Sequence, residues 1–308
     1  MRIHLFYFII VLFVAACERP ADLNLQEFEP QLAIVSNFAL DQRVEVQVSK
    51  TQSPISTNNP EYVANATVAL YQSSQLIEIL TLVPTGNNNP PFYISQQFTP
   101  TSGIEYTLKV QVPDFEPIKA KSILPIPTPI RALSITNVNI KPGKKPIQSV
   151  CEYEVRITFD DPLKVKNYYH LNFYQQLFTY RLEGQDTILT EQVFLKQKFN
   201  SATDENTMIS YFDGGVLFED KNFNGEPISF SFPLQVEMVP SRQLLGNMYA
   251  ELRTVSPEYY LYHNSLSRQQ TSPGGPFSEP VIIYNNIENG QGSFAGYSPA
   301  LDSIAIRY

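Results

Sequence analysis

Residues 149–160 read SVCEYEVRITFD and alternate apolar and polar side chains more regularly than any other stretch of the chain. One set of alternate positions is apolar throughout: Cys151, Tyr153, Val155, Ile157 and Phe159. Successive side chains of a β-strand point to opposite faces, so this pattern predicts a strand with one face in a core and one face in water. The Asp161-Pro162 pair then ends the strand.

The same period of two continues on the N-terminal side of this strand. Val44, Val46 and Val48 alternate with polar residues, which predicts a half-buried strand. Further short strands are expected at 66–71, 76–83, 92–94 and 106–112, separated by turns. This spacing predicts a β-sandwich over residues 31–125, of the immunoglobulin-like or transthyretin-like kind, but without the Cys…Trp…Cys set of antibody domains.

The C-terminal part repeats the pattern over residues 126–308. Five prolines between Pro113 and Pro129 favour an extended, fairly stiff linker, because proline cannot donate to a strand ladder. Beyond it we expect a second sandwich-like domain and hence an all-β chain with two domains. Its strands are predicted at 167–174, 178–182, 187–195, 227–239, 250–255, 281–284 and 303–308.

One short helix is predicted near the C-terminal end, over residues 257–269. Ser256 can cap it, Pro257 suits its first position and Glu258 favours its positive end. Apolar and aromatic residues recur there at helical spacing.

Composition places the chain outside the cytosol. The 308 residues are 43% hydrophobic but only 17% charged, below the ~25% usual in soluble domains. The many Phe, Tyr and Pro residues are typical of extracellular β-proteins. A net charge of −8 argues against nucleic-acid partners and against anionic lipid as a binding surface, because both repel negative chains.

The first seventeen residues have the layout of a bacterial lipoprotein signal. Arg2 precedes an apolar run over 5–16, and Val14-Ala15-Ala16-Cys17 forms a lipobox. We expect a signal peptide at 1–16, palmitate-type acylation of Cys17 and a polar tether over 17–30. Because several acyl chains anchor a protein stably, this predicts a lipid-anchored outer-membrane protein, for which exposure on the cell surface stays an open alternative. Cys151 is then left without a disulfide partner.

Residues 220–225 match the opening of a calcium loop. Asp220, Asn222 and Asn224 place oxygens at alternate positions before Gly225. However, Ser231 stands where a bidentate acid is required, and Asn-Gly is also a common hairpin turn. The turn is therefore the competing interpretation, and no metal or other cofactor is expected.

Catalytic motifs are weak throughout. His170 and His263 lack metal-ligand spacing, and no Gly-x-Ser-x-Gly elbow accompanies them. We interpret both histidines as structural and expect a protein that is not an enzyme. Two alternatives stay open, a surface hydrolase and a glycan-binding module. In the second, the tyrosines that could stack on sugar rings are Tyr168, Tyr174, Tyr259, Tyr260 and Tyr262, although packing in the core and on the sheet faces explains most of them.

Several sequence blocks together resemble a known family. They include Phe159-Asp160-Asp161-Pro162, Pro276-Phe277-Ser278-Glu279-Pro280 and the stretch 285–297, NNIENGQGSFAGY. In these blocks the chain is similar to the Bacteroidota lipoproteins grouped as domain of unknown function 4249. The resemblance implies no catalytic residue. Genes of that family commonly lie beside those of TonB-dependent outer-membrane receptors, which implies an accessory binding protein for such a transporter.

Residues 285–297 are expected to form a glycine-rich loop, since glycine allows unusual backbone angles. Loops on rigid sandwiches often bind ligands, so this loop is the candidate ligand site. Its candidate residues are Asn285, Asn286, Gly290, Gly292, Phe294, Gly296 and Tyr297.

Overall fold

The computed structural model describes residues 29–53, 56, 58–84, 89–163, 165–198, 208–210, 213–221, 223, 225, 227–272 and 281–307. Strands make up 58% of the structure and helix 6%, which confirms the predicted all-β, sandwich-like fold. Within the described ranges, no helix is both long and apolar enough to cross a membrane.

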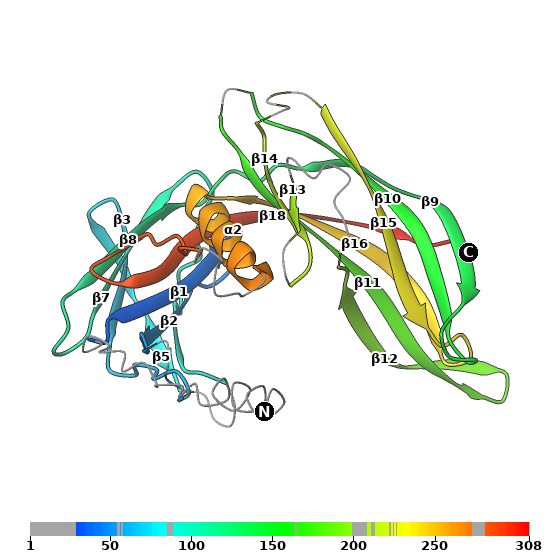
Figure 1. Ribbon diagram of the computed structural model, residues 1–308, viewed down its shortest axis with the longest axis horizontal. Coiled ribbons are helices and arrows are strands. Elements are labelled where there is room, and N and C mark those ends of the chain that lie inside the picture. Colours follow the sequence, from blue (N-terminus) through cyan, green and yellow to red (C-terminus); the bar gives the residue numbers. More distant parts are fainter. Residues whose placement is uncertain are drawn as a thin grey trace, which may run out of the picture.

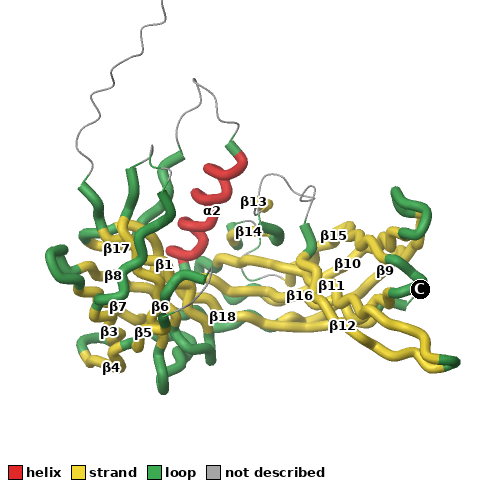
Figure 2. Tube along the Cα trace, turned by 90° about the horizontal axis from the view of Figure 1, so that it is seen from below, coloured by secondary structure: helices red, strands yellow, loops and turns green. Residues whose placement is uncertain are grey.

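One long sheet runs through the whole molecule. Its ten strands follow the order β13-β14-β11-β16-β18-β1-β2-β6-β5, and β12 pairs with β11. Figure 2 shows β18, β16 and β11 running lengthwise between the two ends of the molecule. The strands are β13 (Met208–Ser210), β14 (Val216–Glu219), β11 (Tyr168–Glu183), β12 (Asp186–Lys196), β16 (Gln243–Val255), β18 (Gln291–Ala305), β1 (Leu32–Ala39), β2 (Glu45–Lys50), β6 (Phe92–Ile94) and β5 (Thr81–Val83).

Two smaller sheets cover the long sheet at its two ends. Figure 1 shows an arch with two legs, in which the smaller sheets lie on the outer sides and the long sheet on the inner sides. One leg carries β17 (Ile287–Glu288), β8 (Ile118–Ile123), β7 (Glu105–Gln111), β3 (Thr67–Gln72) and β4 (Gln75–Ile79), and the other carries β15 (Pro227–Met238), β10 (Ser149–Asp160) and β9 (Ile130–Pro142).

The C-terminal leg is built around β10. β10 spans Ser149–Asp160 as predicted, and its five alternate apolar side chains are at most 3% exposed. They pack against the long sheet, where Phe159 contacts Tyr169 with ring centroids 5.2 Å apart. Burial of each such side chain contributes about 1.5–3 kcal/mol, so this strand anchors the C-terminal core.

The N-terminal leg has a core of its own. Val44, Val46 and Val48 are at most 1% exposed, as the period of two predicts. Phe38 stacks on Phe294 with centroids 4.6 Å apart, so β18 supplies part of this core. Each leg is therefore a sandwich of one small sheet and one half of the long sheet.

β18 joins the two sandwiches. Its first half pairs in parallel with β1, from Ala33–Gln291 to Ala39–Tyr297, and its second half pairs antiparallel with β16. The N-terminal sandwich thus contains a segment from the end of the chain. The proposed division at residues 125 and 126 stays a prediction, and the long sheet is continuous across it.

Four local predictions are corrected by the structure. The stretch 113–129 is not linker throughout, because 118–123 form β8 between β7 and β17. The single strand expected over 76–83 is two strands in different sheets, β4 and β5. Residues 281–284 are not a strand, and most of the loop expected over 285–297 lies in β18, because it pairs with β1.

The predicted helix is confirmed as α2 (Pro257–Thr271). The Ser256 hydroxyl accepts a hydrogen bond from the Tyr259 N–H at 3.2 Å, which caps it. Tyr259 and Tyr260 pack against Tyr168 and Ala295 of the long sheet. These sheet residues point away from the small sheets, so α2 covers the middle of the face that lines the hollow of the arch. We call this face of the long sheet the inner face.

Candidate functional site

The two asparagines predicted to bind a ligand hold the end of the chain to the sheets. The Asn285 side chain donates to the Gly290 carbonyl at 2.9 Å. The Asn286 side chain donates to the carbonyls of Lys121 and Phe294, at 3.1 and 2.8 Å, and accepts from the Phe294 N–H. Because these amides already bind backbone groups, they fix the turn that leads into β18.

Among the three predicted glycines, only Gly292 has a positive φ, at +110°. A Cβ placed there would lie 1.9 Å from the Ile34 carbonyl oxygen, and one at Gly296 would lie 2.6 Å from the Ile123 carbonyl oxygen. Gly290 and Gly296 therefore serve close packing, not unusual backbone angles. The glycines let β18 lie close against its neighbours.

Phe294 and Tyr297 point to opposite sides of β18. Phe294 is fully buried in the N-terminal core. Tyr297 lies on the inner face, where the Arg253 guanidinium sits 4.6 Å from its ring centroid. Within the predicted set, Tyr297 is thus the residue that reaches the inner face. Ligand binding by this stretch stays a prediction.

The predicted calcium residues are only partly described. Asn222 and Asn224 lie outside the described residues. Asp220 is 3% exposed, and its carboxylate accepts from the Asn167 N–H at 2.8 Å. Burial and the nearby Asp161 carboxylate raise the pKa of Asp220. Across the described residues, no group of three or more His, Cys, Asp or Glu side chains gathers as metal ligands do.

Both predicted histidines meet at one tyrosine beneath α2. The His170 Nδ1 lies 2.9 Å from the Tyr259 hydroxyl, and the His263 ring lies 4.1 Å from the Tyr259 ring. His170 is 2% and His263 7% exposed. The fold therefore pairs residues from β11 and α2 but encloses them under the helix, away from solvent.

Electrostatics keep this histidine pair neutral. Burial lowers the pKa of His170 well below its usual range, and the neighbouring Arg253 adds to this effect. Burial together with Arg253 and Lys196 lowers the pKa of His263 to about 4. Since a buried cation is costly without a counter-charge, both imidazoles are uncharged at neutral pH.

A buried ion pair lies next to the histidines on β16. The Arg253 guanidinium contacts the Glu251 carboxylate at 2.9 Å and the Tyr259 hydroxyl at 3.3 Å. Glu251 also accepts from the Tyr174 hydroxyl at 3.1 Å. Burial and the Glu251 charge raise the pKa of Tyr174 to about 12. We call His170, Glu251, Arg253, Tyr259 and His263 the polar cluster.

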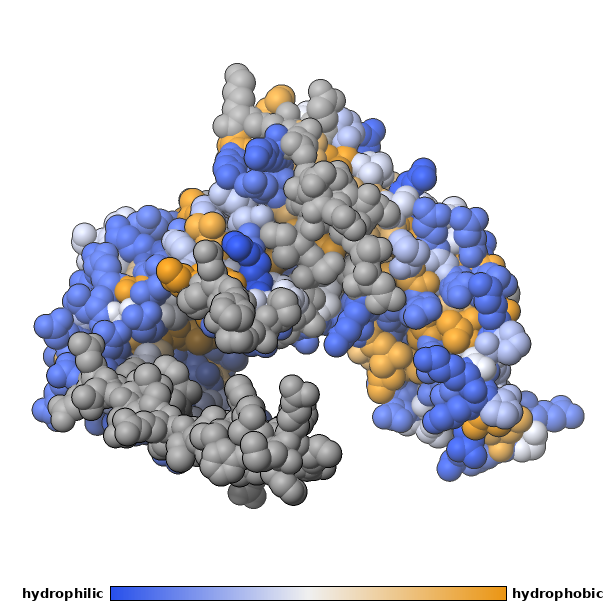
Figure 3. All heavy atoms as spheres, viewed as in Figure 1, coloured by the Kyte–Doolittle hydropathy of each residue, from blue (hydrophilic) through white to orange (hydrophobic). Residues whose placement is uncertain are grey.

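Beyond the polar cluster the inner face is aromatic, and no described helix or strand covers it. Tyr174 and Tyr249 are direct neighbours across β11 and β16, and Phe194 meets Tyr249 edge-on at 5.4 Å. Phe194 is 51% exposed. Figure 3 shows hydrophobic side chains on the side of this leg that faces the hollow. We call Tyr174, Phe178, Phe194 and Tyr249 the aromatic patch.

Exposed leucines extend the aromatic patch on three strands. Leu244 stands opposite Phe178, and Leu301 stands opposite Glu251. Leu189 on β12 and Leu301 on β18 are 54% and 68% exposed. A contiguous apolar surface of this kind is typical of a binding site.

Sequence reasoning found only one residue of this patch, Tyr174. Phe194 and Tyr249 were missed because their strands alternate weakly and their neighbours on the sheet come from distant segments. The available signal was the run Tyr174-Gln-Gln-Leu-Phe178, in which aromatic residues fall on the polar side of the strand.

The two cysteines are placed differently. Cys17 lies outside the described residues, so its acylation stays a prediction. Cys151 is a buried free thiol, and burial raises its pKa. Because the thiolate is the reactive form, Cys151 acts as a small apolar residue of the core.

Comparison with known proteins identifies one family. The sequence pattern of the family described as "Domain of unknown function (DUF4249)" matches residues 18–301. No curated protein matches the chain.

Proposed function

Since the chain belongs to the DUF4249 family, we propose that it is a lipid-anchored outer-membrane protein that binds a partner on its inner face. The observation that carries this proposal is the exposed aromatic patch. Aromatic residues in a concave, partly apolar surface are enriched at binding sites. The enclosed histidine pair supports binding over catalysis, because substrate has no direct path to either imidazole.

The lipobox supports the anchoring part of the proposal. Cys17 would carry the acyl chains, and the first strand begins at Leu32. A fully extended tether from Cys17 to Leu32 spans roughly 50 Å at about 3.3–3.6 Å per residue. The arch can therefore meet a partner well above the membrane surface.

We propose a TonB-dependent transporter as the partner. Support comes from the resemblance of this chain to Bacteroidota lipoproteins. The genes of those lipoproteins commonly lie beside genes for such transporters. A receptor of this type would be held in the same membrane as the anchor. Confinement to one membrane raises the effective concentration of the two proteins, so a modest interface suffices.

Two variants test the anchor and the face separately. Cys17→Ala removes the acylation site, so the protein should lose label from a palmitate analogue and leave the membrane fraction. Phe194→Asp with Tyr249→Asp places charge on the aromatic patch without touching the anchor. Ile126→Asp is the matched control, since Ile126 is 69% exposed but lies between β8 and β9.

The measurement is co-purification from native envelopes in mild detergent. Wild type and Ile126→Asp should retain the transporter, whereas the double variant should lose it. A transporter that co-purifies equally with the double variant would remove the inner face as its binding site. Wild type recovered only as a free lipoprotein would remove the transporter as partner.

A surface glycan is the second candidate ligand. The aromatic patch favours it because Tyr174 and Tyr249 offer ring faces directly opposite each other on β11 and β16. A fluorescent oligosaccharide that binds to wild type, but not to the double variant, would support glycan binding.

A further inference from the structure

β12 leaves one edge of the long sheet open. It is 11 residues long and pairs with β11 on one side, while no described strand pairs with its other side. The Gln197 N–H donates to the Phe173 carbonyl of β11 at 2.8 Å. Because donors alternate along an antiparallel strand, the N–H groups of Lys196, Phe194 and Gln192 point outward from the sheet.

The edge facing it across the C-terminal sandwich contains prolines, and β12 contains none. β15 carries Pro227 and Pro233, which remove backbone donors. β12 has no proline over Asp186–Lys196 and exposes Leu189 and Phe194 by more than half. Proteins usually guard open edges with proline, charge or short strands. β12 carries the charges of Asp186, Glu191 and Lys196 but no proline, so its outward donors and exposed apolar side chains leave this edge able to accept another strand.

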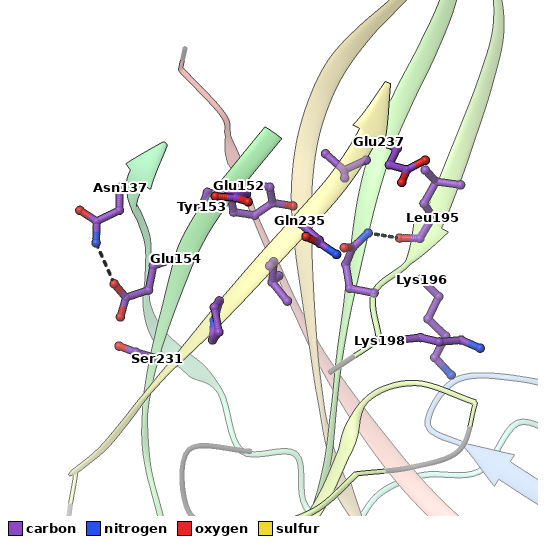
Figure 4. A pocket seen from close by; sticks show the side chains of 14 residues that line it. Asn137, Glu152, Tyr153, Glu154, Leu195, Lys196, Lys198, Ser231, Gln235 and Glu237 are labelled. Atoms are coloured by element: carbon purple, nitrogen blue, oxygen red, sulfur yellow. Dashed lines mark hydrogen bonds between the residues drawn. The ribbon is translucent and has the colours of Figure 1, made fainter. Parts of the chain in front are cut away.

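A groove of about 850 Å³ separates these two edges. In Figure 4, Leu195, Lys196 and Lys198 line it from the β12 side, and Ser231, Gln235 and Glu237 line it from β15. A strand added to the end of β12 would occupy this groove. Side chains on one of its faces would contact Leu195, and those on the other would contact Phe194.

Charges in the groove are unevenly matched. Lys196 pairs with Asp213, and Glu152 pairs with Lys141. Lys198 and Glu237 also line the groove, both are exposed, and neither forms an ion pair with another described residue. An acidic side chain on the incoming strand would meet Lys198 at the C-terminal end of β12.

We propose that the outer edge of β12 receives an extended segment of the partner protein, which joins the long sheet as an additional strand. The segment alternates apolar residues and carries an acid next to Lys198. Main-chain hydrogen bonds give such strand addition its affinity, and side-chain pockets give its specificity. The inference rests on the proposed binding function and names the surface and the chemistry of the partner.

The test combines a photocrosslinker with one backbone deletion. The full chain is expressed in its own cells with p-benzoylphenylalanine in place of Phe194, and cross-linked peptides are sequenced by mass spectrometry. A second preparation carries the crosslinker at Gln235 on the guarded β15 edge. Gln192→Pro removes an outward donor, while Gln192→Thr loses the same side chain but keeps the donor.

We expect Phe194 to cross-link to an apolar, acid-containing segment of another envelope protein. Gln192→Pro should reduce this adduct about tenfold, the effect of losing one well-placed hydrogen bond, and Gln192→Thr should leave it within about twofold of wild type. Thermal melts of both Gln192 variants should match wild type, because the lost donor faces outward.

Other results overturn the inference. They are no adduct at Phe194, an adduct to a second copy of this chain or to glycan, equal adducts at Phe194 and Gln235, and an adduct unaffected by Gln192→Pro. If the sequenced segment belongs to a protein other than a TonB-dependent transporter, the proposed partner fails and the strand addition stands. If the transporter co-purifies but does not cross-link at Phe194, the strand addition fails and the proposed partner stands.

Discussion

Acid should destabilise the protein through the histidines beneath α2. His263 has a pKa of about 4 in the folded chain against 6.5 for a free imidazole. At one pKa unit per 1.36 kcal/mol, this difference corresponds to about 3 kcal/mol. The pKa of His170 is lowered in the same direction, so it adds to the effect.

The direction in which stability changes with pH follows from proton binding. Between pH 6.5 and about 4 the unfolded chain binds a proton at His263 that the folded chain does not, so the free energy of unfolding falls as pH falls. The stability is fully present above pH 6.5 and is lost on acidification through this window. Buried neutral histidines that must charge are a common source of acid denaturation.

The assay is urea unfolding followed by circular dichroism at several pH values from 7 to about 4. Carboxylates titrate in the same window, so wild type is compared with His263→Gln, whose amide cannot charge. The variant should lose about 3 kcal/mol less than wild type on acidification. Identical pH dependence of the two proteins would refute the buried, neutral state of His263.

Two substitutions test how β18 is seated. Gly292→Ala should lower the free energy of unfolding by about 2 kcal/mol or more, because its Cβ would meet the Ile34 carbonyl oxygen. The control is Gly184→Ala, at a position with φ +65° but open space around it, which should lower the free energy of unfolding by about 1 kcal/mol. Equal losses of stability in the two variants would contradict the parallel pairing of β18 with β1. Phe294→Ala should lower the free energy of unfolding by about 3–5 kcal/mol in the same assay. A loss below about 1 kcal/mol would show that Phe294 does not fill the N-terminal core.

Local pattern predicted the strands that have one dry face. The bounds of β10 agree with the prediction because its alternation is complete. The start of α2 agrees with the prediction because Ser256 and Pro257 signal a helix start. β9 was missed, since most of its side chains are exposed and its alternation is correspondingly weak. The stretch 285–297 was predicted as a loop because three glycines outweighed its pairing capacity.

Long-range pairing lay beyond sequence reasoning. Ala33 pairs with Gln291 across the length of the chain, and nothing local to either residue selects the other. The same holds for the candidate site. His170 and His263 were identified singly, but their meeting at Tyr259 depends on how α2 packs on β11 and β18.

A protein that binds its partner as proposed has its inner face occupied in the native envelope. Hydroxyl-radical footprinting of Phe194 and Tyr249, in intact envelopes and in the purified protein, tests it most directly. We predict that both side chains are oxidised in the purified protein and protected in envelopes, while Ile126 is oxidised in both. Equal oxidation of Phe194 and Tyr249 in the two preparations would contradict the account.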